Sequence, residues 1–433
     1  MKMKKLNKAW LPLIAVAALS VFACKNFKDT DWSQWRGHNR TGVSGETGLN
    51  LDWSAKKPAL NWVYRKSGYG YSAPAVVGPT LYCQGGSNGK DFAFALDVHT
   101  GKEKWKQELG AEFEQDRGNG PRGSVTVDGD RLYLIRGGGQ IHCLAAADGK
   151  TIWQKDFKTD FDGNLMSNWG YSESPVIDGN LVICSPGGDN GTMMALDKNT
   201  GAPVWRTKEW TDRASHSSAI VAEAGGIRQY IQQGSKGVAG ISAKDGKLLW
   251  KIDYPPIARP ASAVIPTPVF DDNMVYVTNG SGNGCMGIRL TKAGDGIQAD
   301  TVYTGKIIEN HHGGVVLING HVYGYAERPA NAWVCQHIKT GEIVWSMSGQ
   351  DAGIGKGAVL GIGDRLLCQD ERTGLLVVAA ASPDGWKEFG RMEFPERTDD
   401  DPSRDKSVWT HPVVANGQLY LRDHDLLFCL DLK

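Results

Sequence analysis

The sequence predicts an all-β protein, an eight-bladed β-propeller of four-stranded antiparallel blades, closed by an N-terminal strand that completes the last blade. Three observations carry the prediction: a hairpin motif ending in Trp returns along the chain, its copies are evenly spaced, and eight segments match as inner strands. Helical periodicity is almost absent. A period in the forties with four short strands per repeat indicates propeller blades, and not a sandwich or a solenoid.

The repeated motif is best preserved in AFALDVHTGKEKW, residues 93–105. Apolar residues alternate through Phe92, Phe94 and Leu96, which predicts a half-buried strand. A turn follows and closes at Gly101, where a glycine can take a positive φ, and a second strand ends on Trp105. Further copies are CLAAADGKTIW (143–153), ALDKNTGAPVW (195–205), GISAKDGKLLW (240–250) and CQHIKTGEIVW (335–345).

The turn glycines give the period of the repeat. They fall at Gly101, Gly149, Gly201, Gly246, Gly341 and, in a weaker copy, Gly385. Most intervals are roughly 45 to 50 residues long, a length in the range of propeller repeats. One interval is about twice as long. We expect a decayed copy near Gly294 or Gly296 inside the long interval.

Eight segments match as inner strands, and the last repeat lacks its outer strand. The inner strands are predicted at 72–77, 123–127, 172–177, 217–222, 266–270, 313–318, 357–362 and 410–414. The chain ends at Cys429 to Lys433, where the eighth copy would enter its turn and its Trp strand. The stretch Leu60 to Arg65 carries Trp62 and the alternation of an outer strand. It is therefore predicted to complete the eighth blade and leave no open sheet edge.

The motif A-x-D-x-x-T-G-K-E-x-W resembles the tryptophan-docking motif of propellers related to pyrroloquinoline quinone (PQQ) dehydrogenases, over roughly residues 55 to 433. The stretch Trp32 to Ser44 is similar to the lead-in of PQQ-binding-like β-propeller repeat proteins, whose lipid-anchored relatives include BamB-like lipoproteins. The resemblance implies that each Trp packs against the neighbouring blade. The docking residues it implies are Trp62, Asp97, Gly101, Trp105, Trp153, Trp205, Trp250 and Trp345.

Residues 1–23 are predicted to be a signal peptide, because lysines precede an apolar run from Ala9 to Ala23 that is short for a membrane span. Ala23 before Cys24 resembles a lipoprotein cleavage site, so Cys24 is expected to be acylated; an ordinary secreted protein is the alternative. Residues 24–57 form a lead-in that either tethers the ring or packs on it through its Trp residues, and 58–433 form the propeller. The expected location is the periplasmic side of a bacterial membrane, the outer one.

Composition excludes several classes of partner and site. The chain holds 48 basic and 48 acidic residues, which gives no reason to expect nucleic acid. Seven cysteines remain after Cys24. Six of them fall in two sets of equivalent positions in separate blades, Cys143, Cys335 and Cys429 in third strands and Cys83, Cys184 and Cys368 in second strands, so the cysteines are expected to be small buried hydrophobes and not disulfides. No C-x-x-C-H or C-x-x-C motif supports haem or zinc. A monomer is expected.

Binding chemistry is expected in the long loops that enter the inner strands, at 106–122, 154–171, 251–265 and 394–409. Candidate residues at the channel mouth are Arg117, Arg122, Asn168, Trp169, Tyr171, His216, His311, His312, Lys356, Trp409 and His411, with Glu173 as the candidate catalytic base. Glu173 could equally satisfy backbone donors, and Arg122 and Lys356 could bind an anion or neutralise nearby carboxylates. His311 and His312 are expected to point to opposite sides, so no metal site is predicted; Asp399, Asp400, Asp401 and Asp405 do not follow the spacing of a calcium loop.

Two classes of function remain, with a third beside them. The first is a non-catalytic envelope scaffold without cofactor, which binds an envelope protein or polymer at its loop-rich face. The second is a PQQ- and calcium-dependent dehydrogenase of alcohols or sugars; the resemblance implies that such an enzyme needs a calcium ligand set and a base, for which only Asn168, Trp169 and Glu173 come near. A carbohydrate-binding propeller would stack sugars on Trp169, Tyr171 and Trp409.

Overall fold

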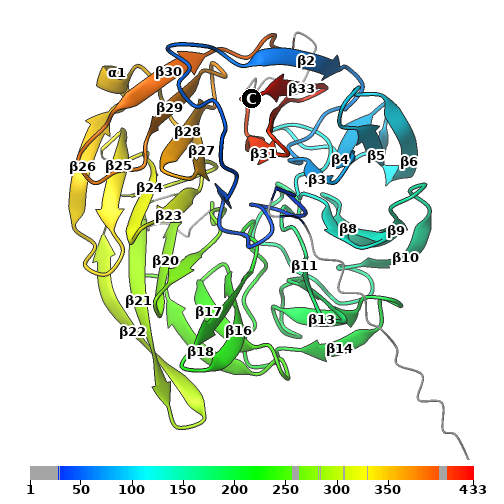
Figure 1. Ribbon diagram of the computed structural model, residues 1–433. Helices are drawn as coiled ribbons and strands as arrows, with labels where there is room; N and C mark the ends of the chain where they lie inside the picture. Colours follow the sequence, from blue (N-terminus) through cyan, green and yellow to red (C-terminus); the bar gives the residue numbers. More distant parts are fainter. Residues whose placement is uncertain are drawn as a thin grey trace, which may run out of the picture.

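Eight antiparallel sheets form a closed ring around a central channel in the computed structural model (Figure 1). The structure describes residue 28 and residues 30–255, 263–280, 282, 284–305, 308–328, 330–398 and 407–433. Within these ranges the single helix is α1 (Gly349–Ala352). The prediction of an eight-bladed propeller is confirmed.

Each blade runs in chain order from the inner strand to the outer strand. Blade 1 holds β3 (Ala75–Val77), β4 (Thr80–Ser87), β5 (Lys90–Asp97) and β6 (Glu103–Ala111), and blade 2 holds β7 (Thr126–Asp128), β8 (Arg131–Ile135), β9 (Gln140–Ala145) and β10 (Thr151–Asp156). Blade 3 holds β11 (Val176–Asp178), β12 (Leu181–Cys184), β13 (Met194–Asp197) and β14 (Pro203–Arg206), and blade 4 holds β15 (Ile220–Ala224), β16 (Ile227–Gln233), β17 (Gly237–Ser242) and β18 (Leu248–Asp253). Blade 5 holds β19 (Val269–Asp271), β20 (Met274–Asn279), β21 (Gly284–Ala293) and β22 (Gly296–Gly305), and blade 6 holds β23 (Val315–Ile318), β24 (His321–Ala326), β25 (Ala332–His337) and β26 (Ile343–Ser348). Blade 7 holds β27 (Gly357–Ile362), β28 (Arg365–Asp370), β29 (Leu376–Ala380) and β30 (Glu388–Met392), and blade 8 holds β31 (Val413–Ala415), β32 (Gln418–Asp423) and β33 (Leu426–Asp431).

The ring closes through β2 (Ala59–Tyr64), which joins blade 8 as its outer strand. The strand pairs antiparallel with β33, and Trp62 lies opposite Cys429. The predicted closure by the stretch around Trp62 is therefore confirmed. It pairs the edge that β33 would otherwise expose.

Blades pack face to face, so their middle strands are buried on both sides. Phe92 to Leu96 of β5 are all buried, whereas the outer strand β6 alternates between exposed and partly buried residues. The expectation of a half-buried strand at Phe92 to Leu96 was wrong, because the neighbouring sheet covers the second face. The outer strands also extend into two of the predicted loops, as far as Ala111 in β6 and Asp156 in β10.

Four Trp residues of the repeat lie on the turn glycine of the next blade: Trp62, Trp105, Trp153 and Trp205. A Cβ at Gly149 would lie 2.7 Å from the ring of Trp105, and one at Gly201 would lie 2.7 Å from the ring of Trp153. The indole N–H also donates to the carbonyl three residues before the glycine, at 2.8 Å from Trp62 to Val98, 3.0 Å from Trp105 to Ala146, 2.9 Å from Trp153 to Lys198 and 2.8 Å from Trp345 to Ser382. At Gly101, Gly149 and Gly201 only glycine leaves room for the ring.

Several blades depart from this rule. A Cβ at Gly385 would meet no atom within 4 Å, although Trp345 makes its hydrogen bond to Ser382, and the indole N–H of Trp205 has no partner among the described residues although its ring lies on Gly246. Trp250 donates to Gln229 of its own blade at 2.6 Å, because blade 5 has no glycine turn at the matching place. Blade 5 instead carries a long hairpin, β21 and β22, which projects from the ring in Figure 1 and turns at Gly294. Its docking residue is Tyr303, whose hydroxyl donates to the carbonyl of Ile338 at 2.7 Å while its ring lies on Gly341.

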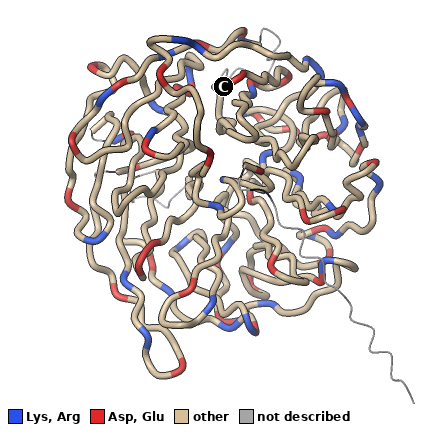
Figure 2. Tube along the Cα trace, in the orientation of Figure 1, with Lys and Arg blue, Asp and Glu red and all other residues tan. Residues whose placement is uncertain are grey.

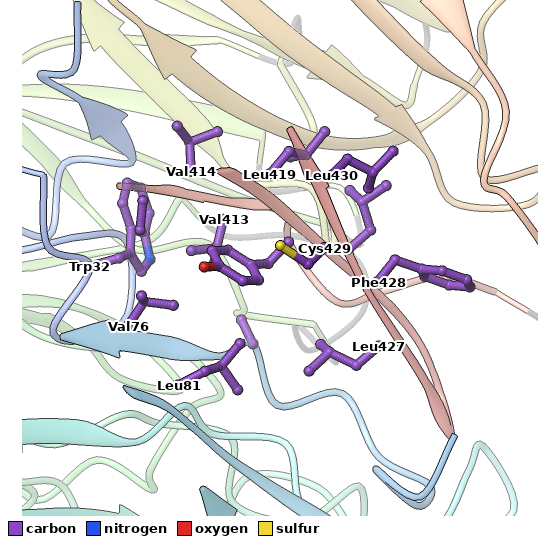
Figure 3. Close-up of a cluster of buried hydrophobic side chains, with 14 of the residues drawn as sticks. Trp32, Val76, Leu81, Val413, Val414, Leu419, Leu427, Phe428, Cys429 and Leu430 are labelled. Carbon is purple, nitrogen blue, oxygen red and sulfur yellow. The ribbon is translucent and has the colours of Figure 1, made fainter. Parts of the chain in front are cut away.

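The lead-in packs across the centre of the ring. Trp32 forms a bridge with Val76 of blade 1, and β1 (Val43–Ser44) pairs parallel with β27 of blade 7. Figure 3 shows Trp32 beside Val76 and Val413, in a buried cluster that continues to Phe428 and Leu430 of blade 8. Of the two alternatives for the lead-in, its described part follows the packed one.

Arg36 and Arg40 fasten the lead-in to the inner strands. Both are buried, and both donate to backbone carbonyls: Arg36 to Val315 at 2.6 Å, and Arg40 to Ala219 at 2.7 Å and Ser174 at 2.8 Å. These carbonyls belong to blades 6, 4 and 3, so two side chains tie three blades to the lead-in. Buried charges that each make several hydrogen bonds hold such a position firmly.

The surface charge is mixed (Figure 2), and the cysteines form no disulfides in the described ranges. Figure 2 shows both signs of charge interspersed around the ring. The seven cysteines from Cys83 to Cys429 are free and buried. No helix in the described ranges is long and apolar enough to cross a membrane. Cys24, the predicted signal peptide and Asp399 to Asp405 lie outside the described residues.

Candidate functional site

A cavity of about 920 Å³ lies in the central channel, where the segments that precede the inner strands converge. The lead-in supplies Trp35 and Arg36 to its wall. The predicted candidates that line it are Arg117, Arg122, Trp169, His216, His311, His312, Lys356, Trp409 and His411. The structure thus brings most of the predicted candidates together in the wall of one cavity; that they bind a ligand or partner stays a prediction.

An aromatic belt of six rings follows the wall: Tyr71, Trp169, His216, His311, His312 and Trp409. The ring centroids of Trp169 and His216 stack at 5.6 Å, and Trp169 meets His311 edge-on at 6.5 Å. His312 stacks on Trp409 at 4.1 Å, and Trp409 lies 5.0 Å from Tyr71. The belt thus joins blades 3, 4, 6, 8 and 1, and holds its rings rigidly by mutual contact.

His311 and His312 both face the cavity, with ring centroids 4.0 Å apart. The expectation that they point to opposite sides was wrong, because the segment is bent and not extended. Asn310 accepts a hydrogen bond from the backbone N–H of Gly314 at 2.8 Å, and Gly314 has a φ of 64°. This turn places successive rings on the same side.

The cavity histidines are held neutral. Burial lowers the pKa of His216, His311 and His411 to about 4, and that of His312 well below its usual value. Ser167 and Ser172 contact the two ring nitrogens of His216 at 2.9 and 3.2 Å, which fixes the imidazole. Neutral imidazoles offer one donor and one acceptor each, so these rings act as hydrogen-bonding groups near pH 7.

The charged groups of the wall are largely satisfied by the protein itself. Lys356 lies between Glu327 and Glu371, at 2.8 and 2.9 Å. Arg122 donates to the carbonyls of Trp169, Gly118 and Gly120, the first two at 2.7 and 2.6 Å. The sequence left open whether Arg122 and Lys356 bind an anion or neutralise nearby carboxylates. Lys356 neutralises two carboxylates, whereas Arg122 holds backbone carbonyls, a structural role that was not predicted.

Three predicted site residues lie outside the cavity wall. Asn168 is exposed, while Tyr171 is buried and donates to the carbonyl of Pro186 at 2.9 Å. Glu173 is buried and accepts from the backbone N–H and hydroxyl of Ser185, at 2.7 and 3.0 Å. Burial raises the pKa of Glu173 to about 7. Of the two roles considered for Glu173, a catalytic base or a carboxylate that accepts hydrogen bonds from the backbone, its contacts agree with the second.

Sequence reasoning missed part of the wall. The unforeseen residues include Trp35, Arg36, Tyr71, Glu327, Glu371 and Arg372. Glu327 and Glu371 directly follow the second strands β24 and β28, and in an antiparallel blade the end of the second strand lies beside the start of the inner strand. Polar residues just after each second strand were therefore a usable signal.

The residues present do not form a calcium site for a quinone cofactor. The two cavity carboxylates, Glu327 and Glu371, already hold the ammonium of Lys356, and Glu173 lies outside the wall. Within the described ranges no group of three or more His, Cys, Asp or Glu side chains is placed to hold a metal ion. Calcium prefers several oxygen ligands at once, which this wall does not offer.

Comparisons with known proteins agree with the fold. BamB from Yersinia pestis is 25% identical over 225 residues, and a tetrathionate hydrolase from Acidithiobacillus ferrooxidans is 25% identical over 237 residues; each alignment takes in about half of this chain. The chain spans about half the length of these curated relatives, 53% and 44%.

Among solved structures, BamB from Moraxella catarrhalis superimposes with a TM-score of 0.59 at 17% identity, over 87% of this chain and 98% of that one. Quinohemoprotein alcohol dehydrogenase from Comamonas testosteroni superimposes with a TM-score of 0.60 at 12% identity, over 93% and 80%. At these identities the likeness is one of fold. The family model described as outer membrane protein assembly factor BamB matches residues 90–347, more than half of the sequence, and the chain therefore belongs to that family of PQQ-like propellers.

Proposed function

We propose that this protein is a non-catalytic cell-envelope propeller that binds an envelope protein or polymer through the face that carries the cavity. The observation that carries the proposal is that the carboxylates that could bind calcium or act as a base are already held by other groups of the protein. Lys356 is paired with Glu327 and Glu371, and Glu173 is buried against Ser185. A general base must reach the proton that it removes, and none of these carboxylates is free to do so.

The family supports the same conclusion, since its relatives carry the name of an outer membrane assembly factor. Rigid aromatic rings at a concave mouth, with exposed arginines beside them, are groups that recur at protein interfaces. Arg117 and Arg372 are exposed at the cavity. We therefore propose that the partner binds the face that carries the cavity and does not contact the outer strands.

An anchored position in the envelope completes the proposal. Acylation of Cys24 would hold the ring at a membrane, the outer one, with the propeller in the periplasm. The protein is proposed to act as a monomer, without a cofactor.

The alternative function is a PQQ- and calcium-dependent dehydrogenase. It is favoured by the fold of the Comamonas testosteroni enzyme and by a cavity in which Trp169 lines the wall. It is opposed by the carboxylates described above, which leave no ligand set for calcium.

Site-specific photocrosslinking tests the docking face. A photoreactive residue would replace Arg117 or Arg372 at the cavity, or Arg289 on the exposed hairpin of blade 5 as the control. We expect the two cavity positions, and not position 289, to give the same discrete crosslinked partner in envelope preparations. Equal labelling from all three positions, or none from the cavity, would refute the proposal.

A further inference from the structure

Three neighbouring nitrogen atoms in the cavity wall have no hydrogen-bond partner among the described residues. They are Nδ1 of His311, Nδ1 of His312 and Nε1 of Trp409, and all three are buried. Their rings contact one another in sequence, at 4.0 and 4.1 Å between centroids. Buried polar atoms are nearly always hydrogen-bonded, so these three neighbouring atoms point to partners from outside the chain, either water or a ligand.

The wall also carries more positive than negative charge, although the whole chain is neutral. Five basic residues line the cavity, Arg36, Arg117, Arg122, Lys356 and Arg372, against two acidic ones. Arg36 and Arg122 donate to backbone carbonyls, which leave their charge uncompensated. A narrow, low-dielectric channel concentrates such a potential and attracts anions.

Arg117 and Arg372 add two exposed positive charges to the cavity wall. Neither forms an ion pair within the described ranges, and the guanidinium of Arg117 lies 5.9 Å from the ring of Trp169. Arginine is the side chain best suited to hold a carboxylate, since its planar fork matches the two oxygens.

From these observations we infer that the cavity binds a saccharide that carries carboxylate groups. Sugar hydroxyls both donate and accept, as the free nitrogens of His311, His312 and Trp409 require. Because the pKa values of both histidines are lowered, their imidazoles are neutral and serve as hydrogen-bonding groups. The carboxylates would pair with Arg117 and Arg372.

The belt favours a sugar over a flat aromatic anion. His312 already stacks on Trp409, and His216 stacks on Trp169, so each indole has one face taken by a neighbour. A sugar ring needs only one aromatic face and several polar edges. The cavity volume of about 920 Å³ is within the range of small-molecule sites. The inference does not depend on the envelope partner proposed above.

Isothermal titration of the full-length protein with three probes tests this inference. The probes are tri-galacturonate, maltotriose as a neutral sugar, and benzene-1,3,5-tricarboxylate as a flat anion. We expect saturable binding of tri-galacturonate, and at least about tenfold weaker binding of the other two, since one charge-assisted hydrogen bond is worth about a factor of ten or more.

Three variants and one control variant locate the site. Arg117→Gln and Arg372→Gln should each weaken tri-galacturonate binding about tenfold, whereas Arg289→Gln, an exposed arginine on β21, should not. Trp409→Phe keeps a ring but removes the indole N–H, and should weaken both sugars. Thermal melts show that each variant is folded before titration.

Several outcomes would overturn the inference. They are no binding of tri-galacturonate by the folded protein, tighter binding of the aromatic tricarboxylate, or equal loss of binding in Arg289→Gln and Arg117→Gln. Because the assay uses purified protein, failure to find an envelope partner leaves its result unaffected.

Discussion

Replacing Gly201 with alanine tests the contact that joins one blade to the next. Gly201 has a φ of 70°, and a Cβ there would lie 2.7 Å from Cε3 of Trp153, a ring that is 8% exposed. A left-handed backbone costs a residue with a Cβ about 1–2 kcal/mol. Forcing a methyl group into a packed contact costs about 1–3 kcal/mol more. Gly201→Ala should therefore lower the free energy of unfolding by about 2–5 kcal/mol.

Gly179→Ala is the matched control for backbone strain. Gly179 has a φ of 59°, and a Cβ there would meet no atom within 4 Å. It should therefore show only the cost of strain, about 1–2 kcal/mol. Urea unfolding curves of the two variants, with and without Trp153→Ala, form a double-mutant cycle. The excess cost of Gly201→Ala should disappear once Trp153 is gone; an excess that persisted in the Trp153→Ala background would refute the docking contact.

Three further predictions follow from the same structure. Deleting Leu60 to Arg65 should expose the edge of β33, so the protein should aggregate or lose its cooperative melt; an unchanged melt would mean that the ring closes otherwise. The pKa of Glu173 is raised to about 7 in the folded protein, from an ordinary value of 4.5. Between these pH values the folded state holds a proton that the unfolded state has lost, so the free energy of unfolding falls as pH rises through this window. Glu173→Gln should gain up to about 3 kcal/mol relative to the parent protein between pH 4.5 and 7, measured by unfolding at both pH values; no pH-dependent difference would contradict the shift. A fatty-acid analogue should label the parent protein and not Cys24→Ala, and an unlabelled parent would be a secreted protein.

The sequence was informative where local chemistry and spacing repeat. Gly101 and Trp105 indicate the hairpin between the third and fourth strands of a blade. The spacing of its copies predicts the number of blades, and Trp62 before the first inner strand predicts that the N-terminal strand closes the ring. These features follow from short-range geometry, because the turn glycines Gly101, Gly149, Gly201 and Gly246 each lie under a Trp ring of the preceding outer strand. Blade 5 escaped the pattern, since Tyr303 and a long hairpin replace the Trp and its glycine turn.

The cavity was predictable only in part. Trp169, His216 and Trp409 lie in the loops before the inner strands, where the sequence placed the candidates, and they line the cavity. Glu327 and Glu371 instead follow the C-terminal ends of the second strands. The turn at Asn310 and Gly314 that brings His311 and His312 together depends on one side-chain hydrogen bond. The entry of the lead-in into the channel depends on carbonyls of distant blades, which no local pattern reveals.

Absorbance spectroscopy with PQQ and calcium tests most directly the claim that this propeller is a binding protein and not an enzyme. The purified full-length protein would be titrated with both and assayed for dye reduction with alcohols and sugars. Since Lys356 occupies the space between Glu327 and Glu371, we expect no saturable visible-absorbance change and no turnover. Stoichiometric PQQ binding with dye reduction, lost in Glu173→Gln, would contradict the account.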